Sequence, residues 1–413
     1  MLKRKHTVLL CTNAYPPNFI GGAELIAHYQ GKALQALGHS AAVFVGSAEP
    51  IGRRHGMRED MFDGIRVARI RLDPSDCEPN FVNFHHPPIE ERFVEVLDRF
   101  RPSVVHFHNI IGLGLGIVGA AHRRGIATVM TLHDHWGFCF RNTLIRPGGA
   151  ICNDYSECAQ CMPYISDGAA RDIPIELRNY YVRLQLRQVD RFISPIAYLA
   201  GAYADAGFDR ARIHVIWNGV DVRRFSQIPR VHRNGPVRFA FLGHLGQHKG
   251  LSLIPDAIAM LPDKTKAQVR IYGDGPMRGY LEQSVGALGL QDSMQLCGKL
   301  ENTRVHEVFA ETDVLLLPSV WPENQPVSIT EAMAASIPAI ASRIGGIPEL
   351  VADGVTGRLV EPGNAKDLSS AMRSCIENSG ARENWGAAAF ERIRNHTFET
   401  QVKEIVKVYD ELS

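Results

Sequence analysis

Short apolar runs alternate with longer amphipathic stretches along nearly the whole chain. In the first half, the runs that favour buried strands are residues 7–12, 41–46, 103–108, 126–133 and 191–195. The pattern restarts farther on, with strand-like runs at residues 237–243, 268–272, 294–297, 313–318 and 339–342. The stretches between these runs have apolar residues at helical spacing. This alternation is typical of α/β proteins with parallel sheets.

Two consecutive α/β halves predict two domains. The chain has 413 residues, and a single core rarely grows beyond about 250–300 residues. We expect an N-terminal Rossmann-like domain over residues 1–225, a second Rossmann-like domain over 226–395, and a helix over 396–413 that crosses back to the first domain. The polar, proline-containing stretch 227–236 is typical of a linker.

Composition and charge exclude several classes of protein. Hydrophobic residues make up 45% of the chain and charged residues 22%, as in soluble globular proteins. The net charge of +1 provides no general field that would favour nucleic acid. No uncharged apolar run approaches the roughly 18 residues that span a bilayer, and the apolar stretch after the basic start is too short for a secretion signal. We therefore expect a cytoplasmic protein with local anion sites.

The loops that follow predicted strands hold residues suited to a phosphate ligand. In open parallel sheets, ligands bind beyond the carboxyl ends of the strands. Gly21 and Gly22 follow the first strand and open a helix, where backbone N–H groups can approach an anion. His244 and Lys249 lie in the loop after strand 237–243, ahead of another helix. Both loops predict anion contacts.

Two carboxylates follow the strand at 313–318. Glu323 lies in the loop after this strand, and Glu331 lies on the helix beyond it. Their spacing resembles the Glu-x7-Glu motif of the retaining family 4 glycosyltransferases. Further elements similar to motifs of that family occur in the family's order, namely Gly21-Gly22, His133-Asp134, Asn218-Gly219-Val220-Asp221, Gly273-Asp274-Gly275-Pro276, Gly345-Gly346-Ile347-Pro348-Glu349 and Gly354-Val355-Thr356-Gly357.

The resemblance covers almost the whole chain and implies a fold and an activity. The fold would be GT-B, an α/β architecture of two facing Rossmann-like domains with the active site in the interdomain cleft. The activity would be that of a hexosyltransferase-type enzyme in glycan or polysaccharide biosynthesis. It would move a sugar, with retention, from a UDP-, GDP- or ADP-sugar to a hydroxyl of a glycan or lipid-linked acceptor.

The resemblance also implies roles for individual residues. Lys249 would neutralise the diphosphate leaving group, Glu323 would bind the donor sugar, and His133 would contact that sugar near the reacting centre. Glu331 would bind the ribose of the nucleotide. The full set of expected donor-binding residues is Gly21, Gly22, His244, Lys249, Gly273, Gly298, Lys299, Leu300, Glu323, Asn324, Gln325, Pro326, Val327 and Glu331. Expected acceptor contacts are His106, His108 and Asp134.

One position departs from the family pattern. Family members commonly carry arginine where this chain has His244, and histidine loses its charge near neutrality. If His244 binds phosphate, donor affinity should fall as the pH rises. The sequence contains no Asp-x-Asp motif of the kind that anchors a metal on a sugar diphosphate, so we expect no catalytic divalent metal.

Two alternatives to a glycosyltransferase stay open at this point. A GT-B-type sugar-nucleotide epimerase would bind a similar donor and need no acceptor. A protein that binds sugar nucleotides without turnover is the second alternative, and His244 motivates it. Weak peripheral association with the inner membrane face is a further hypothesis, with Lys3-Arg4-Lys5 and Arg123-Arg124 as the contributing basic residues.

Four of the eight cysteines crowd into one excursion of the first domain, residues 135–172. They are Cys139, Cys152, Cys158 and Cys161. Four soft ligands suit a tetrahedral, structural Zn²⁺ ion. Free thiols and disulfides are the alternatives, and disulfides are rare in the cytosol.

Overall fold

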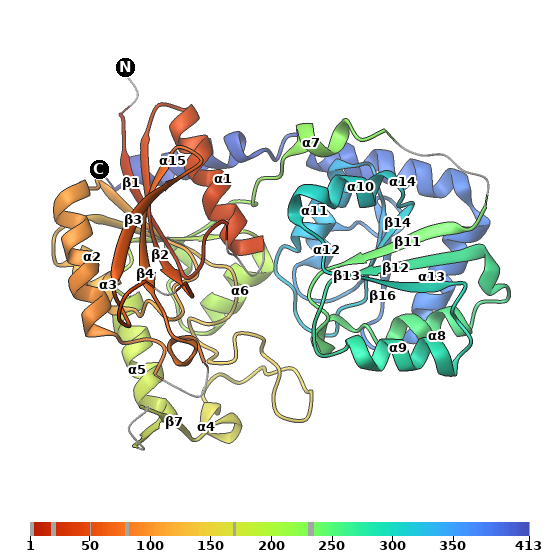
Figure 1. Ribbon diagram of the computed structural model, residues 1–413, viewed down its shortest axis with the longest axis horizontal. Helices are drawn as coiled ribbons and strands as arrows, with labels where there is room; N and C mark the ends of the chain where they lie inside the picture. Colours follow the sequence, from red (N-terminus) through yellow and green to blue (C-terminus); the bar gives the residue numbers. More distant parts are fainter. Residues whose placement is uncertain are drawn as a thin grey trace. The chain divides into compact units, whose positions relative to one another are not determined.

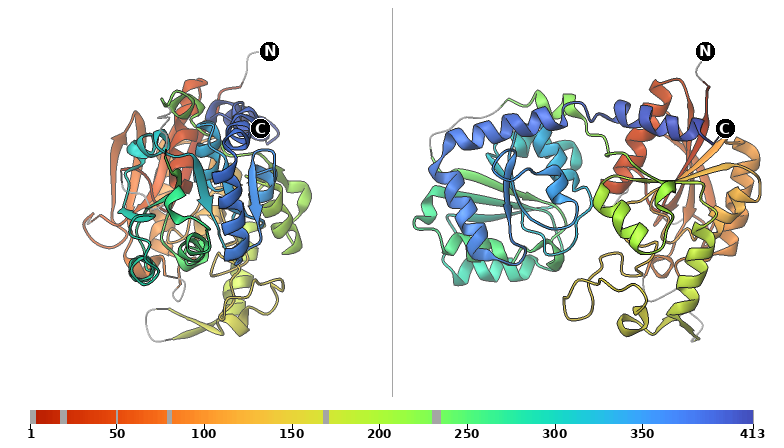
Figure 2. Two further views of the ribbon diagram at one scale, coloured as in Figure 1. Left: turned by 90° about the vertical axis from the view of Figure 1, so that its right-hand side faces the viewer. Right: turned by 180° about the vertical axis from the view of Figure 1, so that it is seen from behind.

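The computed structural model describes residues 4–17, 22–49, 51–78, 82–167, 171–229 and 235–412 (Figure 1). It forms two compact units. The first unit comprises Met1–Gly219 together with Phe398–Ser413, and the second unit comprises Val220–Thr397. Each unit is built on a large, mostly parallel sheet with helices on both sides (Figures 1 and 2). Parts of the predicted linker (230–234) and of the predicted excursion (168–170) lie outside the described residues.

The sheet of the first unit has the strand order β10-β9-β6-β5-β1-β2-β4-β3. These strands are β10 (Ile213–Val215), β9 (Arg191–Ser194), β6 (Ala127–Thr131), β5 (Val104–Phe107), β1 (Thr7–Thr12), β2 (Ser40–Ser47), β4 (Ile65–Arg71) and β3 (Met57–Phe62). The pairs are parallel except for β3, which runs antiparallel to β4. The central strands are continuous apolar runs because helices cover both of their faces.

The C-terminal helix belongs to the first unit. The helices of this unit are α1 (Gly22–Ala36), α2 (Pro87–Phe100), α3 (Gly116–His122), α4 (Cys158–Cys161), α5 (Ile175–Leu186), α6 (Ala197–Asp205) and α15 (Phe398–Asp410). Val402, Ile405 and Tyr409 of α15 are buried in the core of the first unit. Phe398 stacks on Tyr29 of α1, with ring centroids 4.6 Å apart. These apolar contacts fix the end of the chain to the unit in which it begins.

The short elements of the first unit lie around this frame. They are the 3-10 helices η1 (Pro74–Asp76) and η2 (Arg210–Arg212), and the two-stranded sheet of β7 (Tyr164–Ser166) and β8 (Asp172–Pro174).

The sheet of the second unit has the strand order β13-β12-β11-β14-β15-β16, and its pairs are parallel. Its strands are β11 (Val237–Leu242), β12 (Ala267–Tyr272), β13 (Met294–Gly298), β14 (Val314–Leu317), β15 (Ala339–Ser342) and β16 (Gly357–Val360). The strand order reverses between β11 and β14. Such a switch point, at the carboxyl ends of the strands, is where open α/β sheets bind ligands.

Helices flank the sheet of the second unit in a Rossmann-like arrangement. They are α7 (Val222–Ser226), α8 (Leu253–Ala259), α9 (Arg278–Ala287), α10 (Val305–Ala310), α11 (Val327–Ala334), α12 (Ile347–Leu350), α13 (Ala365–Glu377) and α14 (Ser379–Ile393), with the 3-10 helices η3 (Gln247–Lys249), η4 (Lys264–Lys266) and η5 (Asn302–Arg304). The predicted fold class, α/β with two Rossmann-like domains, is confirmed.

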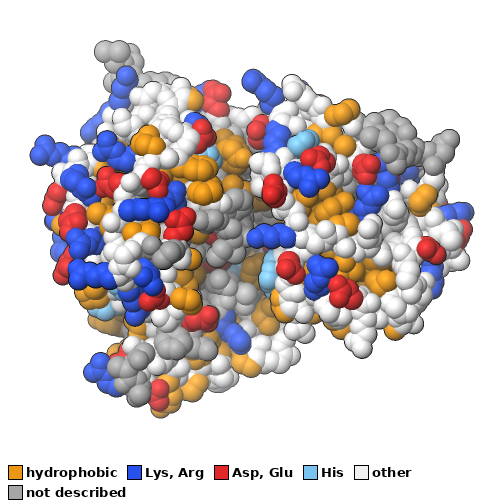
Figure 3. All heavy atoms as spheres, in the orientation of Figure 1, with side chains coloured by type: hydrophobic (Ala, Val, Ile, Leu, Met, Phe, Trp, Pro, Cys, Tyr) orange, Lys and Arg blue, Asp and Glu red, His pale blue; other side chains and the backbone are white. Residues whose placement is uncertain are grey.

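The charges on the surface are mixed in sign, in agreement with the nearly equal numbers of basic and acidic residues in the sequence. Lys and Arg side chains are interspersed with Asp and Glu over the face drawn in Figure 3. Among the described residues, none of the helices has the length and apolar character that crossing a membrane requires.

Candidate active site

A buried ion pair lies at the switch point of the second unit. Lys249 ends η3, in the loop after β11, and Glu323 lies in the loop after the neighbouring strand β14. The Nζ atom of Lys249 donates to Oε1 of Glu323 at 2.6 Å, and the hydroxyl of Ser319 donates to the same oxygen at 2.6 Å. The Glu323 side chain is 6% exposed and that of Lys249 is 18% exposed. Two residues predicted separately from the sequence are thus one hydrogen-bonded pair.

Two aromatic rings border this pair. The Nζ atom of Lys249 lies 5.0 Å from the centroid of the Trp321 ring, within the range of a cation–π interaction. The ring of His248 meets the same indole edge to face, with centroids 5.0 Å apart. Burial, together with the charge of Lys249, lowers the pKa of His248 to about 4. His248 is therefore neutral near pH 7 and leaves Lys249 as the cation beside the indole.

Two glycines allow three loops to meet around Glu323. Gly250 has φ +65°, and a Cβ atom there would lie 1.9 Å from the carbonyl oxygen of Pro318. Gly345 has φ +58°, and a Cβ atom there would lie 2.3 Å from the carbonyl oxygen of Glu323. The next residue, Gly346, donates its N–H to that oxygen at 2.7 Å. The backbone of the ion pair is thus set by close approaches that only glycine permits.

The second predicted carboxylate, Glu331, is half-buried on α11. Burial raises the pKa of Glu331 to about 7, although the positive charge of Arg224 acts in the opposite direction. Arg224 comes from α7, and its guanidinium binds the side chain of Asn302 at 3.1 Å and also the main-chain oxygen of Asn302. Sequence reasoning missed Arg224, Ser319 and Trp321, because only the fold brings them beside Glu331, Glu323 and Lys249 respectively.

The other predicted donor-binding residues divide by their exposure. Asn324 and Gln325 are buried, and Pro326, Val327, Gly298 and Leu300 are half-buried, whereas Lys299 and His244 are exposed. The ring of His244 lies 6.3 Å from that of His248.

Gly273 donates its N–H to the carbonyl oxygen of Gly298 at 2.8 Å, which joins the ends of β12 and β13. Gly21 lies outside the described residues, and Gly22 begins α1 of the first unit.

Three histidines form a stack at the ends of β5 and β6 in the first unit. Their ring centroids are 4.7 Å apart between His106 and His108, and 5.2 Å apart between His108 and His133. Nδ1 of His108 lies 3.0 Å from Nε2 of His133. Burial lowers the pKa of His133 to about 4, so this imidazole is neutral near pH 7. His133 can therefore act by hydrogen bonding rather than by charge.

The three predicted acceptor contacts have different surroundings. His106 is fully buried, with one ring nitrogen bound to Tyr409 at 2.6 Å and the other to Thr131 at 2.7 Å. This is the environment of a structural residue that holds α15 against the sheet, and it leaves no surface for an acceptor. His108 is buried behind His133. Asp134 is half-buried, and burial raises its pKa to about 6.

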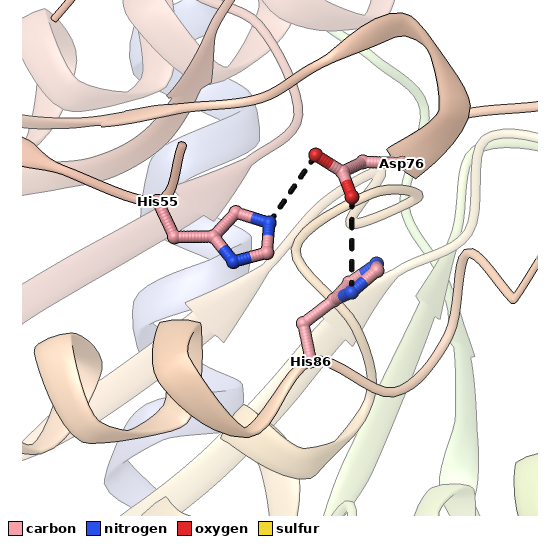
Figure 4. A group of neighbouring side chains, drawn as sticks. All are labelled: His55, Asp76 and His86. Atoms are coloured by element: carbon pink, nitrogen blue, oxygen red, sulfur yellow. Dashed lines mark hydrogen bonds and ion pairs between the residues drawn. The ribbon is translucent and has the colours of Figure 1, made fainter. Parts of the chain in front are cut away.

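A separate cluster of His55, Asp76 and His86 lies in the first unit (Figure 4). Among the described residues, only this group brings three potential His, Cys, Asp or Glu ligand atoms within 4.8 Å of one another. Its carboxylate is already engaged, because Arg54 and His55 both bind Asp76, the latter at 3.2 Å. Burial alone would raise the pKa of Asp76, but these hydrogen bonds hold it well below its usual range. We interpret the cluster as an ion-pair network between loops.

Comparison with known proteins gives one consistent result. The family model described as "Glycosyltransferase Family 4" matches residues 20–224, and the one described as "Glycosyl transferases group 1" matches residues 223–392. A glycogen synthase of Mycobacterium tuberculosis is 26% identical over 404 residues, which cover 94% of this chain and 90% of the relative. The two matched regions overlap at residues 223–224 and together span residues 20–392.

Solved structures share the fold along nearly the full length. Sucrose-phosphate synthase from Thermosynechococcus elongatus has a TM-score of 0.74 at 20% identity, covering 99% of both chains. Anabaena HepE, solved in complex with UDP, has a TM-score of 0.72 at 19% identity, covering 98% of this chain and 100% of the other.

Proposed function

The chain belongs to the family 4 glycosyltransferases, retaining enzymes of the GT-B fold, and from this premise we propose that its Lys249–Glu323 pair binds the sugar diphosphate of the donor. The single observation that supports this role is the buried contact of 2.6 Å at the switch point of the second unit. The pair presents one ammonium group and one carboxylate, which match a diphosphate and sugar hydroxyls respectively.

The proposed roles follow the charge that develops during transfer. The bond between the anomeric carbon and a diphosphate oxygen breaks, the acceptor oxygen forms a new bond on the same face of the sugar, and the proton of the acceptor hydroxyl passes to the departing diphosphate. Negative charge grows on the departing diphosphate, and the ammonium group of Lys249 stabilises that charge. Glu323 accepts hydrogen bonds from the sugar.

The donor is proposed to be a UDP-sugar, because HepE, which shares this fold, was solved with UDP. A thermal-shift screen with UDP-, GDP- and ADP-sugars tests this choice, since a ligand that binds only the folded state raises the melting temperature. We expect the largest shift with a UDP-sugar. A larger shift with a GDP- or ADP-sugar would contradict the choice of base.

Transfer itself is tested by the release of nucleoside diphosphate. We expect release to require an added glycan acceptor. Release at an unchanged rate without an acceptor would favour an epimerase, and donor binding without release across a broad acceptor panel would favour a binding protein.

The ionisation of Glu331 predicts a pH dependence of donor binding. Because burial raises its pKa to about 7, the carboxylate that would accept hydrogen bonds from ribose is only half formed at that pH. The dissociation constant of a UDP-sugar should therefore fall several-fold between pH 6 and pH 8 in calorimetric titrations, since each pKa unit of differential interaction is worth about 1.4 kcal/mol.

The matched control is Glu331→Gln, which keeps the shape and removes the ionisation. This variant should bind the donor with a pH-independent constant. A wild-type dissociation constant that stays flat or rises with pH would reject the assignment to Glu331.

We propose further that the acceptor is lipid-linked and that α5 contacts an anionic bilayer. On this helix Leu177, Tyr180 and Leu184 are 59%, 69% and 45% exposed, at a spacing that places them on one face. Arg183, in the last turn of this helix, and Arg187, directly after its end, are both exposed. Of the basic residues considered from the sequence, Lys3 lies outside the described residues and Arg124 pairs with Asp98 at 3.5 Å.

Co-sedimentation with vesicles tests this contact. The chain should bind vesicles that contain phosphatidylglycerol and should not bind phosphatidylcholine alone. The double substitution Leu177→Asp with Tyr180→Asp should weaken binding about tenfold or more, because two anchoring apolar groups are lost and two negative charges are added. Met260→Asp, at an exposed apolar position of the second unit, is the control. Equal binding by both variants would reject the contact.

A further inference from the structure

The segment that follows His133 gathers four thiols around one pocket. After β6 the chain leaves the sheet in long loops that contain α4 (Figure 1). Cys139, Cys152, Cys158 and Cys161 all line the same pocket, beside apolar side chains that include Phe138. All four are free thiols and half-buried. Four thiols around one pocket are a possible ligand set, whereas scattered cysteines are not.

The backbone already pairs these cysteines. Leu144 connects Cys139 and Cys152. The N–H of Cys152 donates to the carbonyl oxygen of Leu144 at 2.7 Å. The backbone of Leu144 also hydrogen-bonds the sulfur of Cys139. Cys158 and Cys161 lie three residues apart on the single turn α4, a spacing that puts side chains on one side of a helix.

A buried cation beside the thiols lacks a carboxylate partner. Arg178 of α5 is 2% exposed, and within the described part of the chain it has no Asp or Glu oxygen within 4.0 Å. It donates to the carbonyl oxygen of Trp136 at 3.1 Å. It also donates to Oδ1 of the neighbouring Asn179 at 3.2 Å. A buried charge requires compensation.

We propose that Cys139, Cys152, Cys158 and Cys161 bind one structural Zn²⁺ ion. Zinc held by four thiolates carries a net charge of −2, which would compensate the buried Arg178. No three of these sulfurs lie within 4.8 Å of one another in the described residues. Binding would therefore draw these sulfurs closer together.

The metal would fix the position of the turn that directly follows His133 in the chain. Trp136 accepts the hydrogen bond from Arg178, and Gly137 donates to the hydroxyl of Tyr203 at 3.2 Å. The same hydroxyl donates to the carbonyl oxygen of Asp134 at 3.1 Å. A zinc ion bound to Cys139 would thus hold the chain between β6 and the cysteines in one position. This inference does not depend on the proposed function.

Elemental analysis of the full-length protein, purified without added metal and with a reductant, tests the site. We expect about one zinc per chain. Cys158→Ser with Cys161→Ser should lose that zinc, whereas Cys77→Ser, at an exposed cysteine outside the pocket, should retain it. Asp76→Asn should also retain it, which separates this site from the His55–Asp76–His86 cluster. Cobalt substituted for zinc should give the visible absorption of a tetrahedral thiolate complex.

A measurement on the wild type covers the case in which the double variant fails to fold. Bound zinc should protect the four cysteines from alkylation by a maleimide, mapped by mass spectrometry, and a chelator should remove that protection. The inference is overturned by metal-free protein that takes up no added zinc, by zinc that persists in a folded double variant, or by disulfides among these cysteines under reducing purification.

Discussion

Replacing Lys249 by alanine is expected to lower kcat about a hundred- to a thousand-fold. The size follows from the loss of a fixed positive group where negative charge develops in the transition state. The variant also leaves Glu323 buried without its partner at 2.6 Å, and this carboxylate would repel the diphosphate of the donor. Initial rates of nucleoside diphosphate release at saturating acceptor measure the effect on kcat and KM.

A second variant separates catalysis from stability. Lys249→Ala alone should lower the free energy of unfolding by about 3 kcal/mol, because one partner of a buried ion pair is removed. Adding Glu323→Gln removes the unpaired charge, so the double variant should regain most of that stability and remain inactive. If the double variant regained activity as well, the charge of Lys249 would have no part in the chemistry.

Arg238→Ala is the matched control in the same sheet. Arg238 binds Asp313 through two hydrogen bonds, at 2.7 and 3.0 Å, near the amino-terminal ends of β11 and β14. The control therefore breaks a comparable pair at the opposite end of the strands that position Lys249 and Glu323. It should cost stability and leave kcat of the folded enzyme within about twofold of the wild type. A loss of kcat equal to that of Lys249→Ala would point to a general disturbance of the sheet.

Strands with buried, continuous apolar runs were predictable from the sequence, and polar or very short strands were not. β1 and β15 begin and end where the pattern placed them. β3 has the sequence Met-Arg-Glu-Asp-Met-Phe and an exposed, charged face, because it lies at the edge of its sheet. β10 has three residues, too few for periodicity to be recognised.

The sequence singled out the two charged residues of the candidate site but not the residues around them. Lys249 stood out as a charged residue in a loop after a buried strand, and Glu323 stood out because its spacing from Glu331 resembles the Glu-x7-Glu motif. Their roles in donor binding stay predictions. Ser319, Trp321 and Arg224 carry no such signal, since their positions beside the glutamates depend on how the loops fold. His106 is the opposite case, a residue that the sequence suggested for the site and that the structure shows to be structural. Tyr409 and Thr131 occupy both of its ring nitrogens, and nothing in the sequence around a histidine in a strand reveals such partners.

Asp76→Asn is expected to lower the free energy of unfolding of the first unit by about 3 kcal/mol at pH 7. The carboxylate is fully buried and accepts hydrogen bonds from Arg54, from His55 and from the backbone N–H of Asp73, the last at 2.8 Å. Its removal costs charged hydrogen bonds and leaves the basic groups of three loops facing one another. Guanidinium unfolding, followed by a probe in the first unit, measures the difference.

The lowered pKa of Asp76 also sets how this difference depends on pH. A carboxyl group whose pKa is lower in the folded state contributes stability above its unfolded pKa, near 3.9, and that contribution is lost as the pH falls toward the folded value. The difference in the free energy of unfolding between wild type and Asp76→Asn should therefore stay constant from pH 7 to about pH 5 and become smaller below about pH 4. Glu49→Gln, which removes the partner of the exposed Arg58, should cost less than about 1 kcal/mol. A gap that does not change down to pH 3 would show that the packing of Asp76, and not its charge, stabilises the cluster.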